Sequence, residues 1–144
     1  MTNEQICDRL NEILGLELAG TMMYLNYSFF IYGHARIPIV GWLRSQAGEG
    51  ITHATEVGEK ITAFGGTPVT FPAADQFKPR FDSLDDMLRS ALALEKNAFN
   101  KYASLLRDIE NENLVLRVFL ENKVGEESEH IEEIEKMLRP DVVH

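Results

Sequence analysis

The chain has 144 residues, 44% of them hydrophobic and 26% charged, as in an ordinary globular protein, and we expect a single domain over residues 1–144. Its 23 acidic and 14 basic residues give a formal net charge of −9, which argues against nucleic acid as a partner because such binding needs a basic patch. The sequence has no apolar run long enough to span a membrane, no leader-like start and a lone cysteine, so we expect a cytoplasmic protein without a membrane partner.

Two helices are predicted in the first half of the chain. Apolar residues at helical spacing begin near Asn3 and continue to Phe30 or Tyr32, where "YGHARIP" interrupts them. A second periodic segment begins near Pro38, a residue suited to the first turn of a helix, and runs to Phe64, just before "GG". No segment alternates in the manner of a β-strand, so the sequence predicts an all-α fold.

Two further helices are predicted after a long connection. This connection, "GGTPVTFPAADQFKPRFDS", holds three of the five prolines and shows no helical spacing. The third helix is predicted to begin after the N-cap Ser83, with Asp86 three residues later as in a near capping box, and to run to about Glu110. "NEN" then leads into a fourth helix that ends before Pro140.

The lengths of the connections predict how the helices are arranged. The first and third connections are short, so helices one and two, and helices three and four, should form antiparallel hairpins. The middle connection of about 18 residues is long enough to cross the length of a bundle. The sequence therefore predicts a ferritin-like, up-down-down-up four-helix bundle with one long crossover between the second and third helices.

A weak internal repeat places one glutamate on the core-facing side of the first helix and one on that of the third. Glu17 is followed seven residues later by Tyr24, and Glu95 is followed at the same interval by Tyr102. A carboxylate on an apolar face is costly unless it is paired, protonated or bound to a metal. Two of them at equivalent positions indicate a site inside the bundle.

A third glutamate and two histidines fall on the inward faces of the other helices. In "EESEH", Glu127 and His130 are three residues apart and share a helix face, and His53 continues the apolar face of the second helix. Carboxylate oxygen with imidazole nitrogen suits iron or manganese and, less specifically, zinc. Taken alone, His130 fits better as a hydrogen-bonded core or surface histidine, so the inference of a metal depends on the whole set.

Three stretches, "LNEILGLELAGTMMYLNY", "MLRSALALEKNAFNKYASL" and "EESEHIEEIEKML", resemble the bacterioferritins, and the resemblance covers nearly the whole chain. It implies a diiron site in which Glu17 and Glu95 are the terminal ligands and Glu127 bridges the two irons. His53 and His130 would each complete one iron. It also implies that Tyr24 lies close to this site, where it either supplies an electron or holds a ligand carboxylate by a hydrogen bond.

The stretch "GEGITH" departs from the pattern of that family. Gly50 stands where the second bridging glutamate would be, and Ile51 replaces the methionine that would bind haem, so we expect no haem. The short fifth helix of the family has no counterpart in this sequence. Glu49 either replaces the missing bridge, helped by a π-bulge between its flanking glycines, or points to solvent.

These residues predict a bacterioferritin-like protein that binds iron and oxidises Fe(II) with oxygen or peroxide for iron storage or detoxification. It should form a homodimer or a larger oligomer or shell. The main alternative, favoured by Gly50, is a binding or structural subunit with an impaired or single-metal site; another is a peroxidase-like diiron enzyme without storage. The candidate metal ligands are Glu17, Glu49, His53, Glu95, Glu127 and His130, and Tyr24 is the candidate catalytic residue.

Overall fold

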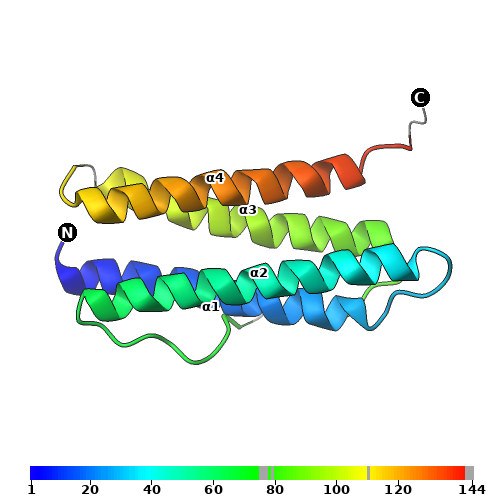
Figure 1. The fold of residues 1–144 in the computed structure, drawn as a ribbon, viewed down its shortest axis with the longest axis horizontal. Coiled ribbons are helices and arrows are strands. Elements are labelled where there is room, and N and C mark those ends of the chain that lie inside the picture. The colour runs from blue at the N-terminus through cyan, green and yellow to red at the C-terminus, as the bar shows by residue number, and fades with distance from the viewer. Residues whose placement is uncertain (75–77, 79, 110, 142–144) are drawn as a thin grey trace.

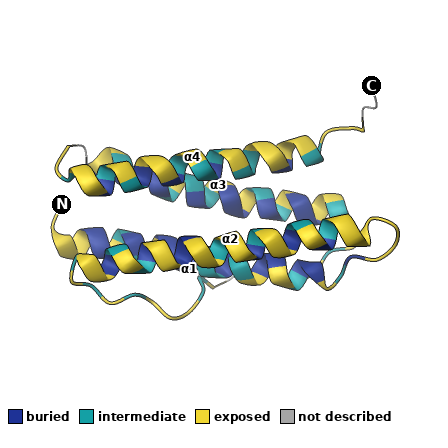
Figure 2. Ribbon diagram, viewed as in Figure 1, coloured by how far each residue is buried: buried dark blue, intermediate teal, exposed yellow. Residues whose placement is uncertain are grey.

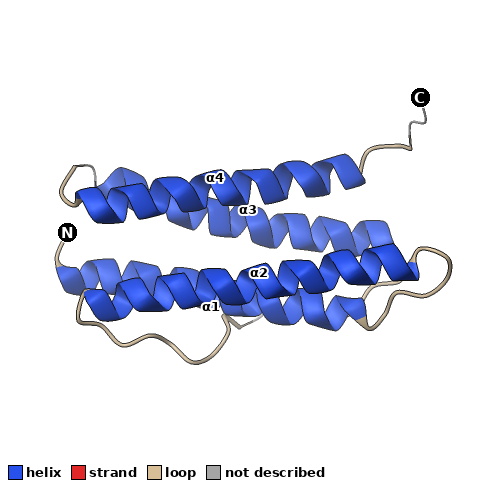
Figure 3. Ribbon diagram, in the orientation of Figure 1, coloured by secondary structure: helices blue, strands red, loops and turns tan. Residues whose placement is uncertain are grey.

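Four α-helices form the computed structural model, which describes residues 1–74, 78, 80–109 and 111–141. They are α1 (Asn3–Ser28), α2 (Arg36–Ala63), α3 (Leu84–Ile109) and α4 (Leu114–Met137). Figure 3 shows helices and loops but no strand in this described part of the chain. Within the same residues, no helix has the length and apolar character that crossing a membrane requires.

The helix boundaries lie close to those expected from the sequence. α1 ends at Ser28, slightly before the expected end at Phe30 or Tyr32. α2 begins at Arg36, which places Pro38 within its first turn, where backbone N–H groups have no partner inside the helix. The expected end of the third helix, Glu110, lies outside the described residues.

Local polar contacts fix where the helices begin and end. The hydroxyl of Ser83 accepts a hydrogen bond from the backbone N–H of Asp86 at 3.1 Å, and Asn113 Oδ1 accepts one from Leu116 N–H at 2.9 Å. Such N-caps satisfy N–H groups that the first helical turn leaves unpaired. After α2, Gly65 adopts a φ of 82°, a left-handed conformation that glycine reaches without steric cost, and the helix stops there.

The helices pack as two antiparallel hairpins. In Figure 1, α1 and α2 lie side by side and run in opposite directions, as do α3 and α4. α3 begins at the end of the bundle opposite to the end where α2 finishes, so the connection between them spans the length of the bundle. The predicted up-down-down-up, ferritin-like arrangement is thereby confirmed.

Two apolar clusters fill the bundle, one toward each end. One cluster includes Leu10, Ile61 and Leu105, and the other includes Met23, Leu43 and Leu88. Figure 2 shows that the buried residues follow the inward faces of the helices. Between the clusters along each helix lies a layer of buried polar side chains, which are Glu17, His53, Glu95, Lys123 and Glu127. The site is therefore held at mid-bundle by apolar packing on both sides.

Candidate metal centre

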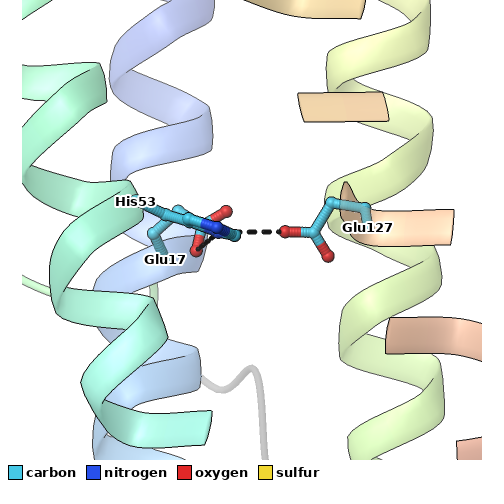
Figure 4. Close-up of side chains that lie close together, drawn as sticks. All are labelled: Glu17, His53 and Glu127. Atoms are coloured by element: carbon cyan, nitrogen blue, oxygen red, sulfur yellow. Dashed lines mark ion pairs between the residues drawn. The ribbon is translucent and has the colours of Figure 1, made fainter. Parts of the chain in front are cut away.

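One group of possible metal ligands is contributed by α1, α2 and α4. His53 Nδ1 lies 3.6 Å from Glu17 Oε2 and 3.5 Å from Glu127 Oε1. All three side chains are buried, and one atom from each lies within 4.8 Å of the others. Figure 4 shows Glu17 and His53 together on one side, with Glu127 reaching toward them from the opposite side.

A second group is contributed by α3 and α4. His130 Nδ1 lies 3.8 Å from Glu95 Oε2 and 3.9 Å from Glu127 Oε2. The two oxygens of Glu127 thus face different histidines, Oε1 toward His53 and Oε2 toward His130. A carboxylate shared in this way between two ligand groups has the placement that a bridge between two metal ions requires.

Two tyrosines hold the outer oxygens of the terminal glutamates. The Tyr24 hydroxyl donates a hydrogen bond to Glu95 Oε1 at 2.6 Å, and the Tyr102 hydroxyl donates one to Glu17 Oε1 at 2.9 Å. Each tyrosine therefore orients the glutamate of the other hairpin. The tyrosine–glutamate repeat was the signal in the sequence, although no role at the site was predicted for Tyr102. Burial, followed by the charge of the adjacent glutamate, raises the pKa of both phenols well above the usual range.

Two further glutamates contact the far sides of the histidine rings. Glu126 Oε2 lies 2.8 Å from His53 Nε2, and Glu49 Oε2 lies 2.6 Å from His130 Nε2. Because an outer carboxylate fixes the orientation of an imidazole ring, these contacts turn both Nδ1 atoms toward Glu127. Glu126 was missed in the sequence analysis, although it directly precedes Glu127 in "GEESEH".

Glu49 is the one candidate ligand that the structure does not bring into either group. Its side chain is about half exposed (48%) and contacts the nitrogen of His130 that faces away from Glu127. α2 runs as α-helix through this stretch, without the π-bulge considered from the sequence. The arrangement favours the interpretation in which Glu49 does not replace the bridging glutamate that is absent at position 50.

The close packing of α1 against α2 explains why position 50 is glycine. A Cβ atom on Gly50 would overlap the Thr21 hydroxyl, and it would also lie 3.4 Å from Thr21 Cβ. The Thr21 hydroxyl itself donates a hydrogen bond to the backbone oxygen of Glu17 at 3.0 Å. The side chain of Thr21 therefore occupies the space that the stem of a glutamate at position 50 would use.

Crowding of carboxyl groups changes the proton affinity of the bridging candidate. Burial, followed by the neighbouring carboxylates of Glu95 and Glu17, raises the pKa of Glu127 far above its usual range. Burial also disfavours ionised Glu95, but Glu127, His130 and Tyr24 stabilise its charge and lower its pKa to about 2. Glu127 is therefore the carboxyl group that keeps a proton when no cation is present.

The histidines are also biased toward the protonated form. Burial alone would lower the pKa of His130, but the carboxylates of Glu95 and then Glu49 outweigh it and raise that pKa to about 9. Burial likewise opposes charge on His53, while Glu17 outweighs it, so the pKa of His53 is raised as well. In the metal-free protein, protons on the histidines thus balance the negative charge of the surrounding carboxylates. A bound cation would balance that charge instead.

Two buried atoms indicate that a cation fits this site. Among the described residues, Glu127 Oε2 and His130 Nδ1 are the buried side-chain atoms without a hydrogen-bond partner. Buried polar atoms are almost always paired, so these two unpaired atoms point to a ligand. The cavity beside them, about 20 Å³, has room for a water-sized atom. Carboxylate and imidazole donors suit iron or manganese.

An acidic cleft between α2 and α4 connects the site with the surface. It has a volume of about 380 Å³, and the rings of His53 and His130 form part of its wall. Four glutamates also line it, which are Glu49, Glu126, Glu129 and Glu133. A cleft with this charge raises the local concentration of cations. The cleft therefore joins the two histidines of the ligand groups to the surface through acidic side chains.

Comparison with solved structures gives several matches over nearly the whole chain. A ferritin-like, diiron-carboxylate protein from Bacillus anthracis str. Ames is 28% identical, with a TM-score of 0.88 over 95% of this chain and 97% of that chain. The bacterioferritin-related protein from Bacteroides fragilis, described as a dodecameric thioferritin, is 19% identical, with a TM-score of 0.87 over 96% of this chain and 86% of that chain. The bacterioferritin from Desulfovibrio desulfuricans is 20% identical, with a TM-score of 0.84 over 94% and 79%.

Comparison at the level of sequence gives the family. No curated protein matches the chain. The family model described as the ferritin-like domain matches residues 7–141. That range covers most of the chain, contains both ligand groups and confirms the resemblance noted from the sequence. The chain therefore belongs to the family of ferritin-like domain proteins.

Proposed function

We propose that this protein binds two Fe(II) ions within its helical bundle and oxidises them. The observation that carries the proposal is the position of Glu127, whose two oxygens face two separate histidine–glutamate pairs. The orphaned Glu127 Oε2 and His130 Nδ1 atoms support it, because a cation would satisfy both. The ligands on this proposal are Glu17, His53, Glu95, Glu127 and His130, with Glu49 as an orienting residue behind His130.

The residues of the site have separate tasks in this reaction. Each Fe(II) substrate would receive one terminal glutamate, one histidine and one oxygen of Glu127. Two Fe(II) ions each lose one electron, and dioxygen accepts these two electrons with two protons and leaves as hydrogen peroxide. With hydrogen peroxide as the oxidant, the same two electrons and two protons give two water molecules. The carboxylates suit the harder Fe(III) that forms, while the histidines suit Fe(II).

Tyr24 has two roles open to it on this proposal. Its short hydrogen bond to Glu95 supports a positioning role, because it fixes which oxygen of Glu95 faces His130. Because its hydroxyl contacts a proposed ligand carboxylate, Tyr24 would also be placed to supply an electron. A positioning role affects metal affinity, whereas electron supply affects the oxidation rate at full metal occupancy.

The proposed oxidation is tested by loading the protein with Fe(II) in the absence of air and then admitting air. We expect two irons per chain after desalting, and an absorbance increase from Fe(III) that is faster than in protein-free buffer. Oxidation at the protein-free rate would overturn the proposal. The size of the particle in solution, measured on the same sample, distinguishes iron storage in a shell from oxidation without storage.

A second candidate function is that of a subunit with a single-metal site. The packing of Thr21 over Gly50 favours it, because the second bridging carboxylate found in the family's pattern has no equivalent at this position. On this alternative one iron per chain binds in the loading experiment, and oxidation does not exceed the protein-free rate.

The assembly state is proposed to be a homodimer or a larger oligomer. Exposed apolar side chains near the end of α1 support self-association, since Met22 and Leu25 on the helix and Phe29 at its C-cap are all exposed. The Bacteroides fragilis protein is a dodecamer, which supports the same proposal by similarity.

Haem is not expected in such an assembly. Ile51 is exposed on α2 and has no atom that could bind haem iron. Adding haem to the purified protein should therefore produce no shifted Soret band, and a stoichiometric six-coordinate haem spectrum would contradict this prediction.

A further inference from the structure

The supporting contacts of the two histidines are duplicated, but a charged residue beside one of them is not. His53 and His130 are 77 residues apart in the sequence. The glutamates that contact their rings, Glu126 at His53 and Glu49 at His130, are separated by the same interval. In each case a glutamate from the opposite hairpin contacts Nε2 of the histidine. The same interval relates Lys123 on α4 to Gln46 on α2, so one member of this pair carries a positive charge and the other is neutral.

Lys123 is an unusual lysine because it is almost completely buried, with 2% of its surface exposed. Its ammonium group contacts the Glu56 carboxylate and lies 3.2 Å from Glu126 Oε2. That same oxygen of Glu126 is 2.8 Å from His53 Nε2. A single carboxylate oxygen therefore separates the buried ammonium group from the imidazole of His53.

In the described part of the chain, the carboxylate behind His130 has no such cation beside it. Glu49 contacts His130 Nε2, and within the described residues no lysine or arginine forms an ion pair with Glu49. The glutamate related to Glu56 by the same interval is Glu133, which lines the cleft. Glu49 thus corresponds to Glu126, and Glu133 to Glu56, whereas the buried positive charge of Lys123 corresponds to the neutral Gln46.

From this difference we propose that Lys123 makes the two metal positions unequal and sets the order in which they fill. The first divalent cation binds at Glu95, Glu127 and His130, where the surrounding charge is more negative. The second binds at Glu17, His53 and Glu127 with lower affinity, because a buried positive charge repels a dication across a region of low dielectric. This inference deepens the proposed function, on which it rests, by assigning a sequence to metal loading.

The order is measured with Co(II), titrated into the metal-free full-length protein by calorimetry and followed by its visible absorbance. We expect two steps per chain, separated at least tenfold in affinity. Two site variants assign the steps: Glu95→Gln should remove the tighter step, and Glu17→Gln should remove the weaker one. If Glu95→Gln retains the tighter step, the proposed order is wrong.

The role of the lysine is then tested by changing its charge. Lys123→Met should strengthen the weaker step at least tenfold and bring the two steps together, whereas Lys123→Arg, which keeps the charge, should leave them separate. The matched control is Lys101→Met, at a lysine whose side chain is about half exposed (44%) and pairs with Glu12. Unchanged separation in Lys123→Met, with helix content equal to that of the wild type, overturns the proposal.

A second variant makes the surroundings of His53 more positive and changes a residue that is not buried. Glu56 is about half exposed (45%), and Glu56→Gln removes a negative charge that offsets Lys123. The weaker step should become weaker still, while the tighter step is unchanged. Strengthening of the weaker step by Glu56→Gln would contradict the inference even if Lys123→Met fails to fold.

These titrations separate failure of the inference from failure of the proposed function. Two Co(II) ions that bind with equal affinity, or in the reverse order, overturn only the role of Lys123. Binding of a single Co(II) per chain contradicts both the loading order and the two-iron oxidation on which it rests.

Discussion

The α1–α2 hairpin and the α3–α4 hairpin each supply a glutamate, a histidine and a tyrosine to the centre of the bundle. Glu17 and Glu95 are held by tyrosines of the opposite hairpin, and both histidines are held from behind by glutamates of the opposite hairpin. The hairpins differ at the bridging position, where α4 has Glu127 and α2 has Gly50. The supporting contacts of the proposed two-metal site are thus duplicated, while the proposed bridging carboxylate comes from α4.

The largest effect should follow from removing the shared side chain. Glu127→Ala deletes the one carboxylate that serves both ligand groups, so we expect loss of both metal positions and of Fe(II) oxidation above the protein-free rate. Alanine has the highest helix propensity, so the helix content measured by circular dichroism should not fall. The control is Glu121→Ala, at an exposed position of α4. Two irons per chain in Glu127→Ala would show that the hairpins bind metal independently.

The second largest effect should be a dependence of metal affinity on pH. The raised pKa values mean that His130, at about 9, and Glu127 are protonated in the metal-free protein at neutral pH. Binding must displace these protons, so the affinity should rise with pH up to about pH 9, by up to about tenfold per pH unit for each proton displaced. Co(II) titrations at about pH 6, pH 7 and pH 8 test the sign.

A matched variant connects this pH dependence with the α2 side of the site. Glu49 is one of the carboxylates that raise the pKa of His130. Glu49→Gln should therefore lower that pKa and make the rise in affinity with pH shallower. An affinity that falls as pH rises would contradict the assignment of these groups as ligands.

Much of this arrangement was predictable from the sequence, because periodicity and connection length determine the topology of a bundle. The positions of Glu17 and Glu95 were recognisable because a carboxylate stands out on an apolar helix face. Glu126 and Glu49 were harder to interpret, since each lies beside a ligand position and its partner is on a helix of the other hairpin. Burial of Lys123 had no signal, because lysines on helices are usually exposed.

A third prediction restores the missing bridge on α2. The double variant Thr21→Ala/Gly50→Glu introduces a carboxylate one turn before His53 and removes the hydroxyl that the new side chain would overlap. We expect metal affinity to rise by about tenfold, since a second bridging carboxylate would serve both ligand groups. Gly50→Glu alone should gain less, because Thr21 must first move.

The matched control for the restored bridge is Gly48→Glu, which adds the same charge at an exposed position with open space around it. An equal gain from Gly48→Glu would show that added negative charge, and not a bridging ligand, is responsible. No gain in the double variant, with the fold intact, would show that one bridge already satisfies the site.

The smallest expected effects concern the two tyrosines, and they test whether the hairpins are equivalent in chemistry as well as in geometry. Tyr24→Phe and Tyr102→Phe each remove one hydrogen bond to a terminal glutamate, so each should weaken metal binding by about two- to tenfold. If both tyrosines only position carboxylates, their oxidation rates at saturating Fe(II) should fall equally little. If Tyr24 also supplies an electron, Tyr24→Phe should slow oxidation at full metal occupancy while Tyr102→Phe does not. Stopped-flow oxidation of fully loaded protein makes this comparison, and equal rates in the two variants would assign Tyr24 a positioning role alone.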